Sequence, residues 1–98
     1  MARLIWTQQA LDDLEQLLEF IAKDAPVAAC RFAEKIIEHV EVLQKYPKLG
    51  GLIPEDERGI YRQLVQGSYR VIYRSEGEFI YLVAVHHAAS LLNTEDLT

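Results

Sequence analysis

The sequence predicts an α+β fold in which two helices pack on one face of an antiparallel sheet. Apolar residues recur with helical spacing through the first half of the chain, up to residue 47. After a loop at residues 50–59, three runs rich in β-branched and aromatic side chains follow one another, separated by short turns. The expected order is therefore strand, helix, helix and three strands, which forms a single domain over residues 1–98.

The first half of the chain predicts a short strand followed by a helical hairpin. Residues 2–6 contain β-branched and aromatic side chains and no residue that breaks a strand. Thr7 offers a hydroxyl that can cap a first helix over residues 8–23. Pro26 disfavours helical geometry at the preceding residue but suits the first turn of a second helix, which ends near Pro47. The expected apolar stripes are Ala10, Leu11, Leu14, Leu17, Leu18 and Ile21 in the first helix, and Ala29, Phe32, Ala33, Ile36, Ile37, Val40 and Leu43 in the second.

The second half of the chain predicts a three-stranded antiparallel meander. We expect strands at residues 60–66, 69–74 and 79–87, joined by tight hairpins. The last run is apolar on both faces, as expected of a central strand that is covered on both sides. Strict alternation places Ile80, Leu82 and Ala84 on one face, and Phe79, Tyr81, Val83 and Val85 on the other. For residues 88–98 we expect either a short helical turn or a flexible tail.

Composition excludes several classes of protein. Half of the residues are apolar and 26% are charged, which is the balance of a soluble globular domain. The N-terminal apolar run is too short for a secretory signal, and no run approaches the roughly 20 residues that cross a bilayer, so we expect a cytoplasmic protein that does not engage a membrane. The net charge of −5 has the wrong sign for general binding to nucleic acid, and we expect no sequence-specific DNA binding.

The sequence also lacks the patterns of a metal or cofactor site. Cys30 is the only cysteine, so no intrachain disulfide can form, and we expect it to pack on the apolar side of the second helix. Of the histidines His39, His86 and His87, only the last two are close in sequence, and their side chains diverge on a strand. The pair Gly50–Gly51 lacks the Lys and Ser/Thr of a phosphate-binding loop. We therefore expect no metal and no cofactor.

Four arginines lie in the strand region of this acidic chain: Arg58, Arg62, Arg70 and Arg74. Alternation places Arg70 and Arg74 on the same side of their strand, where a planar guanidinium can bind a carboxylate or a phosphate. Arg62 lies one strand earlier and joins them if the hairpin register allows it. Three interpretations stay open: docking of a partner or structural pairing with Asp or Glu, contact with a target, and plain solvated surface.

A set of segments in a fixed order runs through the chain. It comprises a strand ending at Trp6, "ALDDL" in the first helix, "RFAEKI" in the second, the "LQKYPKLG" turn, "YRQLV" with "YRVIYR", and a last strand ending in "VHH". From about Leu4 to Leu92, this set resembles the ParE branch of the RelE/ParE toxin superfamily. The resemblance implies that family's fold and the role of toxin in a bacterial type II toxin–antitoxin pair. It also implies a ParD-like antitoxin that binds and silences the toxin in a hetero-oligomer.

The resemblance implies one of two activities on a shared scaffold. ParE-like members inhibit DNA gyrase by binding it, whereas RelE-like members cut messenger RNA on the ribosome. Cleavage needs groups that move protons and cations that stabilise the charged phosphorane, and the candidates here are Arg70, Arg74, His86 and His87. Because these candidates are few, a non-enzymatic gyrase inhibitor is our leading interpretation. A RelE-like ribonuclease and a degenerate member that only binds antitoxin are the alternatives.

Several residues are assigned to the expected partners. The antitoxin is expected to lay an amphipathic helix over the seam of the two helices and an acidic segment beside the sheet arginines. Its candidate contacts are Arg62, Arg70, Arg74, Leu14, Leu18 and Tyr73, and the candidate contacts of the target are His86, His87 and Ser90. Many ParE-like sequences carry arginines just after the final His, where this chain has Ala88, Ala89 and Ser90. Either another surface meets the target, or Ser90 marks an attenuated variant.

Overall fold

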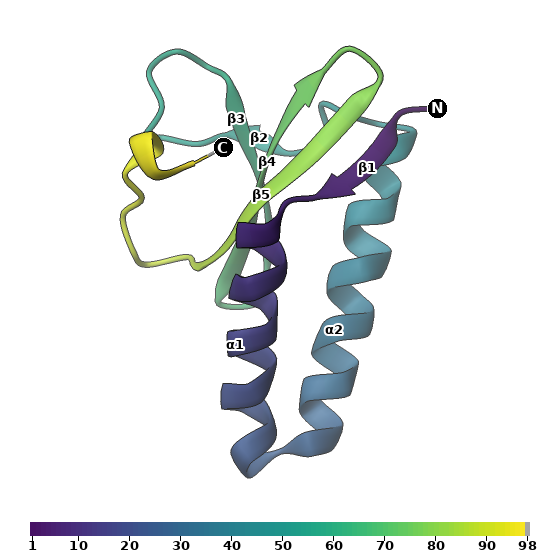
Figure 1. Cartoon of the computed structure of the whole chain (residues 1–98), viewed down its shortest axis with the longest axis vertical. Coiled ribbons are helices and arrows are strands. Elements are labelled where there is room, and N and C mark those ends of the chain that lie inside the picture. The colour runs from purple at the N-terminus through teal and green to yellow at the C-terminus, as the bar shows by residue number, and fades with distance from the viewer. Residues whose placement is uncertain (98) are drawn as a thin grey trace.

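A computed structural model describes residues 1–97 and shows a five-stranded sheet with a helical hairpin on one face (Figure 1). The sheet has the strand order β1-β5-β4-β3-β2. In chain order the elements are β1 (Arg3–Trp6), α1 (Gln8–Asp24), α2 (Pro26–Glu41), a 3₁₀ turn (Val42–Gln44), β2 (Gly51–Leu52), β3 (Tyr61–Gln66), β4 (Tyr69–Glu76), β5 (Phe79–His87) and a second 3₁₀ turn (Thr94–Asp96). The predicted α+β class, the hairpin and the antiparallel β3-β4-β5 meander are confirmed.

The sheet is mixed and not purely antiparallel, which corrects the sequence prediction. β1 pairs in parallel with β5, from Arg3 beside Phe79 to Trp6 beside Leu82. The helical hairpin returns the chain to the start of β1, where the Ala2 amide donates to the Gln44 carbonyl at 3.0 Å, and the antiparallel meander then leaves β5 running in the same direction as β1. The loop expected at residues 50–59 also contains the two-residue strand β2, which pairs with β3.

Helix α1 begins where the sequence predicts and is bonded to β5. The Thr7 hydroxyl accepts a hydrogen bond from the Ala10 amide at 3.2 Å and donates one to the Leu82 carbonyl at 2.8 Å. Further along α1, the Asp13 carboxylate accepts a hydrogen bond from the Val85 amide at 3.0 Å. Burial raises the pKa of Asp13, while this hydrogen bond and the nearby His86 lower it. These bonds fix the first half of α1 against the sheet.

A β-bulge in β5 changes which of its residues face the helices. Tyr73 pairs with Leu82 and Ile72 pairs with Ala84, so Val83 is an extra residue in β5. Beyond the bulge the alternation is reversed. Val85 packs with Leu82 in the cluster beneath the helices, and Ala84 packs with Ile72 on the opposite face. The expected faces of Ala84 and Val85 are therefore wrong.

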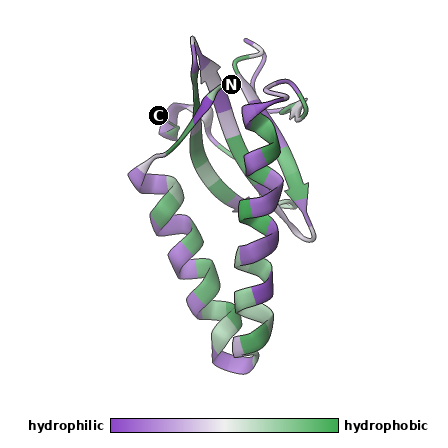
Figure 2. Cartoon of the chain, turned by 90° about the vertical axis from the view of Figure 1, so that its right-hand side faces the viewer, coloured by the Kyte–Doolittle hydropathy of each residue, from purple (hydrophilic) through white to green (hydrophobic). Residues whose placement is uncertain are grey.

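The sheet buries apolar residues on both faces, as predicted for a central β5. Figure 2 shows hydrophobic and hydrophilic residues alternating along both helices, as expected of helices with one buried side. The cluster beneath the helices contains Ala10, Ile36, Val40, Leu43, Leu64, Val71, Tyr73, Ile80, Leu82 and Val85. The cluster on the opposite face contains Ile53, Tyr61, Ile72, Val83 and Ala84, with Tyr81, Leu92 and Leu97 packed against it.

The C-terminal segment crosses the sheet face that lies opposite the helices. The Ala88 amide donates to the Ser68 carbonyl at 2.8 Å, and Leu92 and Leu97 pack on the apolar cluster of that face. Of the two alternatives left open for residues 88–98, the structure contains a short 3₁₀ turn at Thr94–Asp96. Thr98 lies outside the described residues. Within residues 1–97 there is no helix with the length and apolar character needed to cross a bilayer.

Candidate partner-binding site

Arg70 lies in a buried network on the sheet face opposite the helices, with only 4% of its surface exposed. Its guanidinium forms an ion pair with Glu55, from the loop between β2 and β3. It also donates to the Gln63 side-chain oxygen at 3.0 Å and to the Ser90 carbonyl at 2.8 Å. The Glu55 carboxylate accepts a further hydrogen bond from the Leu92 amide at 3.0 Å. We call this network, which fastens the C-terminal segment to the sheet, the tail clasp.

The electrostatics of the tail clasp keep Glu55 ionised. The hydrogen bond from Arg70 lowers the pKa of Glu55 from 4.5 to about 2, even though burial acts in the opposite direction. Glu55 is therefore ionised at neutral pH and neutralises the guanidinium beside it. Of the interpretations that the sequence leaves open for Arg70, the structure shows structural pairing with an acidic residue.

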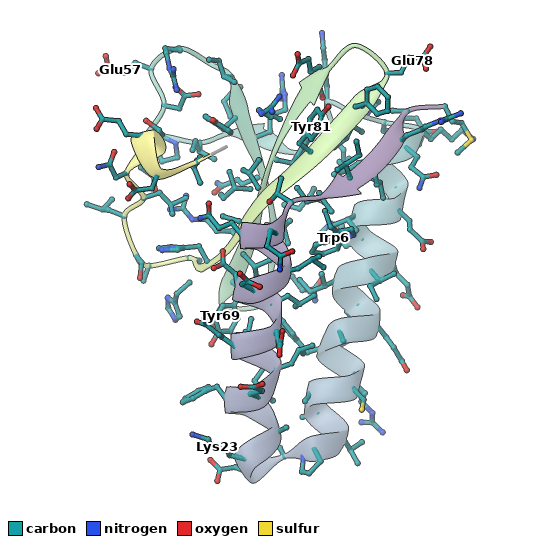
Figure 3. The ribbon with its side chains drawn as sticks, in the orientation of Figure 1. Trp6, Lys23, Glu57, Tyr69, Glu78 and Tyr81 are labelled. Carbon is teal, nitrogen blue, oxygen red and sulfur yellow. The ribbon has the colours of Figure 1, made fainter. Side chains whose placement is uncertain are left out.

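Arg74 shares the face of Arg70, as alternation along β4 predicts. Its Nη1 lies 2.7 Å from a carboxylate oxygen of Glu76, and its guanidinium stacks 4.3 Å from the centre of the Tyr81 ring. Figure 3 shows Tyr81 on β5, in the upper part of the sheet. Arg62 lies on the other face, because the register places it beside Tyr73. It donates to the Gly50 carbonyl at 2.7 Å and does not join the other two arginines.

Tyr73 lies beneath the helices and is fully buried. Its hydroxyl accepts a hydrogen bond from the Gly50 amide at 2.9 Å and donates one to the Pro47 carbonyl at 2.8 Å. Burial raises the pKa of this hydroxyl. A Cβ added at Gly50 lies 2.4 Å from the Gln63 carbonyl oxygen, so this close approach requires glycine. Tyr73 is one of the candidate antitoxin contacts, but its side chain is fully buried, so a partner cannot contact it in this structure.

The two adjacent histidines diverge, as expected on a strand. His86 lies beside Arg70 in the register, and its Nδ1 is buried without a hydrogen-bond partner. His87 is exposed, packs edge-on against Tyr69 at 5.3 Å between ring centres, and accepts a hydrogen bond from the Ala89 amide at 3.1 Å. The structure therefore brings together Arg70, His86 and the Ser90 backbone, and places His87 apart from them.

The helical hairpin projects beyond the sheet, with Lys23 near its tip (Figure 3). Between α1 and α2, this projecting part has an apolar groove, which we call the hairpin groove. It is lined by Leu18, Glu19, Ala22, Pro26, Ala29, Cys30 and Ala33. Leu18, a predicted partner contact, lines it, whereas Leu14 packs against the core. Cys30, which is expected to pack on the apolar side of α2, lines this groove but is exposed and is not packed in the core.

The sequence patterns predict only a loop for the segment that holds Glu55 and its neighbour Asp56, and they predict no role for either residue. The Asp56 side chain is buried and accepts hydrogen bonds from the amides of Ile60 at 2.8 Å and Tyr61 at 3.0 Å. Three consecutive acidic residues at positions 55–57, shortly before a strand, are the sequence signal for this organised loop. Over residues 1–97, no three His, Cys, Asp or Glu side chains lie close enough together to hold a metal ion.

The comparisons with known proteins define the class of this protein. A family model described as the ParE toxin of the type II toxin–antitoxin system parDE matches residues 4–92. A curated relative, Toxin RelE2 of Caulobacter vibrioides, is 31% identical over 91 residues, which span 93% of this chain and all of the relative. The class is thus that of toxins in type II toxin–antitoxin systems. Within it, this chain belongs to the ParE toxin family.

A solved structure has the same fold. It is described as the chromosomal ParDE TA system from P. aeruginosa, and one of its chains superposes with a TM-score of 0.75. The alignment covers 89% of this chain and 96% of that chain, with 24% sequence identity. This likeness shows that the element order and sheet topology described above are those of a ParE-like fold.

Proposed function

We propose that this toxin inhibits DNA gyrase by binding it and stalling it on cleaved DNA, and that a ParD-like antitoxin neutralises it in a hetero-oligomer in the bacterial cytoplasm. Membership of the ParE family supports a toxin that acts with an antitoxin. The burial of Arg70 is the observation that favours inhibition by binding over RNA cleavage. Its guanidinium is buried and bonded to Glu55, Gln63 and the Ser90 carbonyl, so it cannot reach a phosphate while the tail clasp is closed.

The chemistry of RNA cleavage supports the same choice. A ribonuclease needs accessible cations around the scissile phosphate and a group that accepts the 2′-hydroxyl proton. On the face of Arg70, the other candidate cation is Arg74, which is held by Glu76 and Tyr81. A toxin that acts by binding needs only a complementary surface and no such arrangement.

The second candidate function is a RelE-like ribosome-dependent ribonuclease. The specific observation in its favour is the placement of His86 beside Arg70, with an Nδ1 that has no hydrogen-bond partner. If the C-terminal segment left the sheet, a histidine and an arginine would be exposed together on one face. A third possibility is a degenerate member that only binds antitoxin, which the residues Ala88, Ala89 and Ser90 after the histidines suggested.

The hairpin groove supports the proposed antitoxin contact. It is lined mainly by small and apolar side chains, including Leu18, Ala22 and Ala33. Small side chains let a partner helix approach closely, and an amphipathic helix with apolar residues three and four positions apart fits such a groove. The lining residues belong to the end of α1 and the start of α2, and Figure 1 shows this part of the hairpin projecting beyond the sheet, so a partner can reach it without disturbing the sheet.

Two assays run side by side test this proposal. The purified toxin is added to a gyrase supercoiling assay and to a ribosome-dependent mRNA cleavage assay, each with and without the cognate antitoxin. We expect inhibited supercoiling that the antitoxin relieves, and intact mRNA. Cleaved mRNA with normal supercoiling would replace this proposal with the ribonuclease. No effect in either assay, together with intact antitoxin binding, would identify a degenerate member.

A further inference from the structure

A second surface furrow runs between α2 and the turn that joins β3 to β4. Helix α2 contributes Val27, Ala28, Arg31, Phe32 and Lys35, and the turn contributes Gln66 and Gly67. The furrow continues past Lys35 and Gln66 to Glu38 and His39. We call it the α2 furrow. Because successive helical residues are rotated by about 100°, the furrow and the hairpin groove lie on roughly opposite sides of α2.

The α2 furrow carries positive charge on an acidic protein. Arg31, Lys35 and His39 are four residues apart, so they lie along one ridge of the helix. Among residues 1–97, neither Arg31 nor Lys35 takes part in an ion pair of the structure, whereas Arg70 is paired with a carboxylate. Glu38 lines the His39 end of the furrow, so the positive potential is strongest around Arg31 and Lys35.

The floor of the α2 furrow is apolar. Phe32 is half-buried and packs edge-on against Tyr69, with 5.5 Å between the ring centres. Val27 has 65% of its surface exposed beside it. A surface with two cations along an apolar strip is complementary to a peptide that combines carboxylates with apolar side chains. Nucleic acid fits less well, because a phosphate backbone needs a run of cations and the furrow has Arg31 and Lys35 with Glu38 at one end.

We propose that the α2 furrow binds an acidic segment of the antitoxin, with carboxylates beside Arg31 and Lys35 and an apolar side chain over Phe32. The proposal rests on the proposed function, since the antitoxin is the partner. From the sequence, we expect this acidic segment to lie beside the sheet arginines. We place it in the α2 furrow instead, because Arg70 is buried within the tail clasp. An antitoxin that occupies both the furrow and the hairpin groove holds α2 from two sides.

Charge reversal tests this proposal in the full-length toxin. The furrow variant is Arg31→Glu with Lys35→Glu, and the matched control is Lys23→Glu with Lys48→Glu, which makes the same charge change at exposed positions outside the furrow. Binding of fluorescently labelled cognate antitoxin is measured by anisotropy at low and high salt. At low salt we expect the furrow variant to bind about tenfold more weakly and the control within about twofold of wild type. High salt should narrow the gap, because it screens exposed charges.

The possible outcomes separate this proposal from the proposed function. Equal weakening in both variants, or none in the furrow variant, would overturn the furrow contact while leaving the antitoxin as a partner. Failure of wild-type toxin to bind the antitoxin at all would overturn both. If the furrow variant instead loses affinity for a short single-stranded DNA and keeps its antitoxin affinity, the furrow serves nucleic acid and the proposal is wrong. Circular dichroism checks that all variants are folded, and the furrow variant should still inhibit gyrase but resist neutralisation.

Discussion

Replacing Glu55 by Gln tests the tail clasp, because the change removes one charge and keeps the shape of the side chain. The shift in the pKa of Glu55, from 4.5 to about 2, sets how much the ionised pair contributes to the free energy of unfolding. At about 1.4 kcal/mol per pKa unit, the ionised clasp stabilises the fold by about 3 kcal/mol at most. The Gln side chain keeps an amide oxygen that can accept a hydrogen bond from Arg70, so we expect a loss of about 2 kcal/mol. In a domain of this size that loss lowers Tm by roughly 10 °C.

The pH dependence of this stabilisation has a defined sign. The pKa of Glu55 is lower in the folded than in the unfolded chain, so its contribution is fully present above pH 4.5 and is lost as the pH falls toward about 2. Wild type should therefore be more stable than Glu55→Gln at neutral pH, and the two should converge in acid. Other carboxylates, such as Asp56, titrate in both proteins and cancel in the difference.

Thermal and urea unfolding, followed by circular dichroism from neutral to acidic pH, measure this difference. The matched control is Glu57→Gln, which neutralises an exposed residue of the same loop (Figure 3). It should leave Tm nearly unchanged. If the gap between wild type and Glu55→Gln stays constant down to about pH 2, or if there is no gap at neutral pH, the ionised pair does not hold the clasp and the reasoning fails.

Three further changes address other parts of the molecule. Tyr73→Phe should destabilise the fold by about 2 kcal/mol, because it leaves the Gly50 amide without its bond, while Tyr46→Phe at an exposed ring should have little effect in the same urea titration. Leu18→Glu in the hairpin groove should weaken antitoxin binding by about tenfold or more in calorimetry, and Leu11→Glu outside the groove should not. Ser90→Arg should strengthen growth arrest in cells if this chain is an attenuated toxin, and an equally harmless variant would count against attenuation.

Much of the fold follows from local patterns in the sequence. The helical spacing of apolar residues, the Thr7 cap and Pro26 predict α1 and α2 to within a residue at their starts, because helix signals are local. The meander follows from its β-rich runs and glycine turns. The parallel pairing of β1 with β5 joins strands more than seventy residues apart, and no local pattern encodes it.

The faces of the side chains were harder to predict than the strands. Strict alternation of side chains correctly predicts that Arg70 and Arg74 lie on the same face of the sheet, because the pairing of β4 with β3 is regular. It failed for Ala84 and Val85, because a bulge inserts one residue without any change in composition. The burial of Arg70 depends on Glu55 and on the C-terminal segment, and both reach it through loops that sequence periodicity does not describe.

Only one half of the helical hairpin packs on the sheet, and this difference affects the free energy of binding a partner. Near the sheet, α1 is tied to β5 through Thr7 and Asp13, whereas the half around Lys23 has only the other helix beside it (Figure 1). Opening of the tip therefore exposes fewer apolar contacts and costs less free energy than opening of the base, and amide exchange should rise toward residue 24. A ligand in the hairpin groove would add the missing layer, so recognition and local ordering of the toxin are thermodynamically linked.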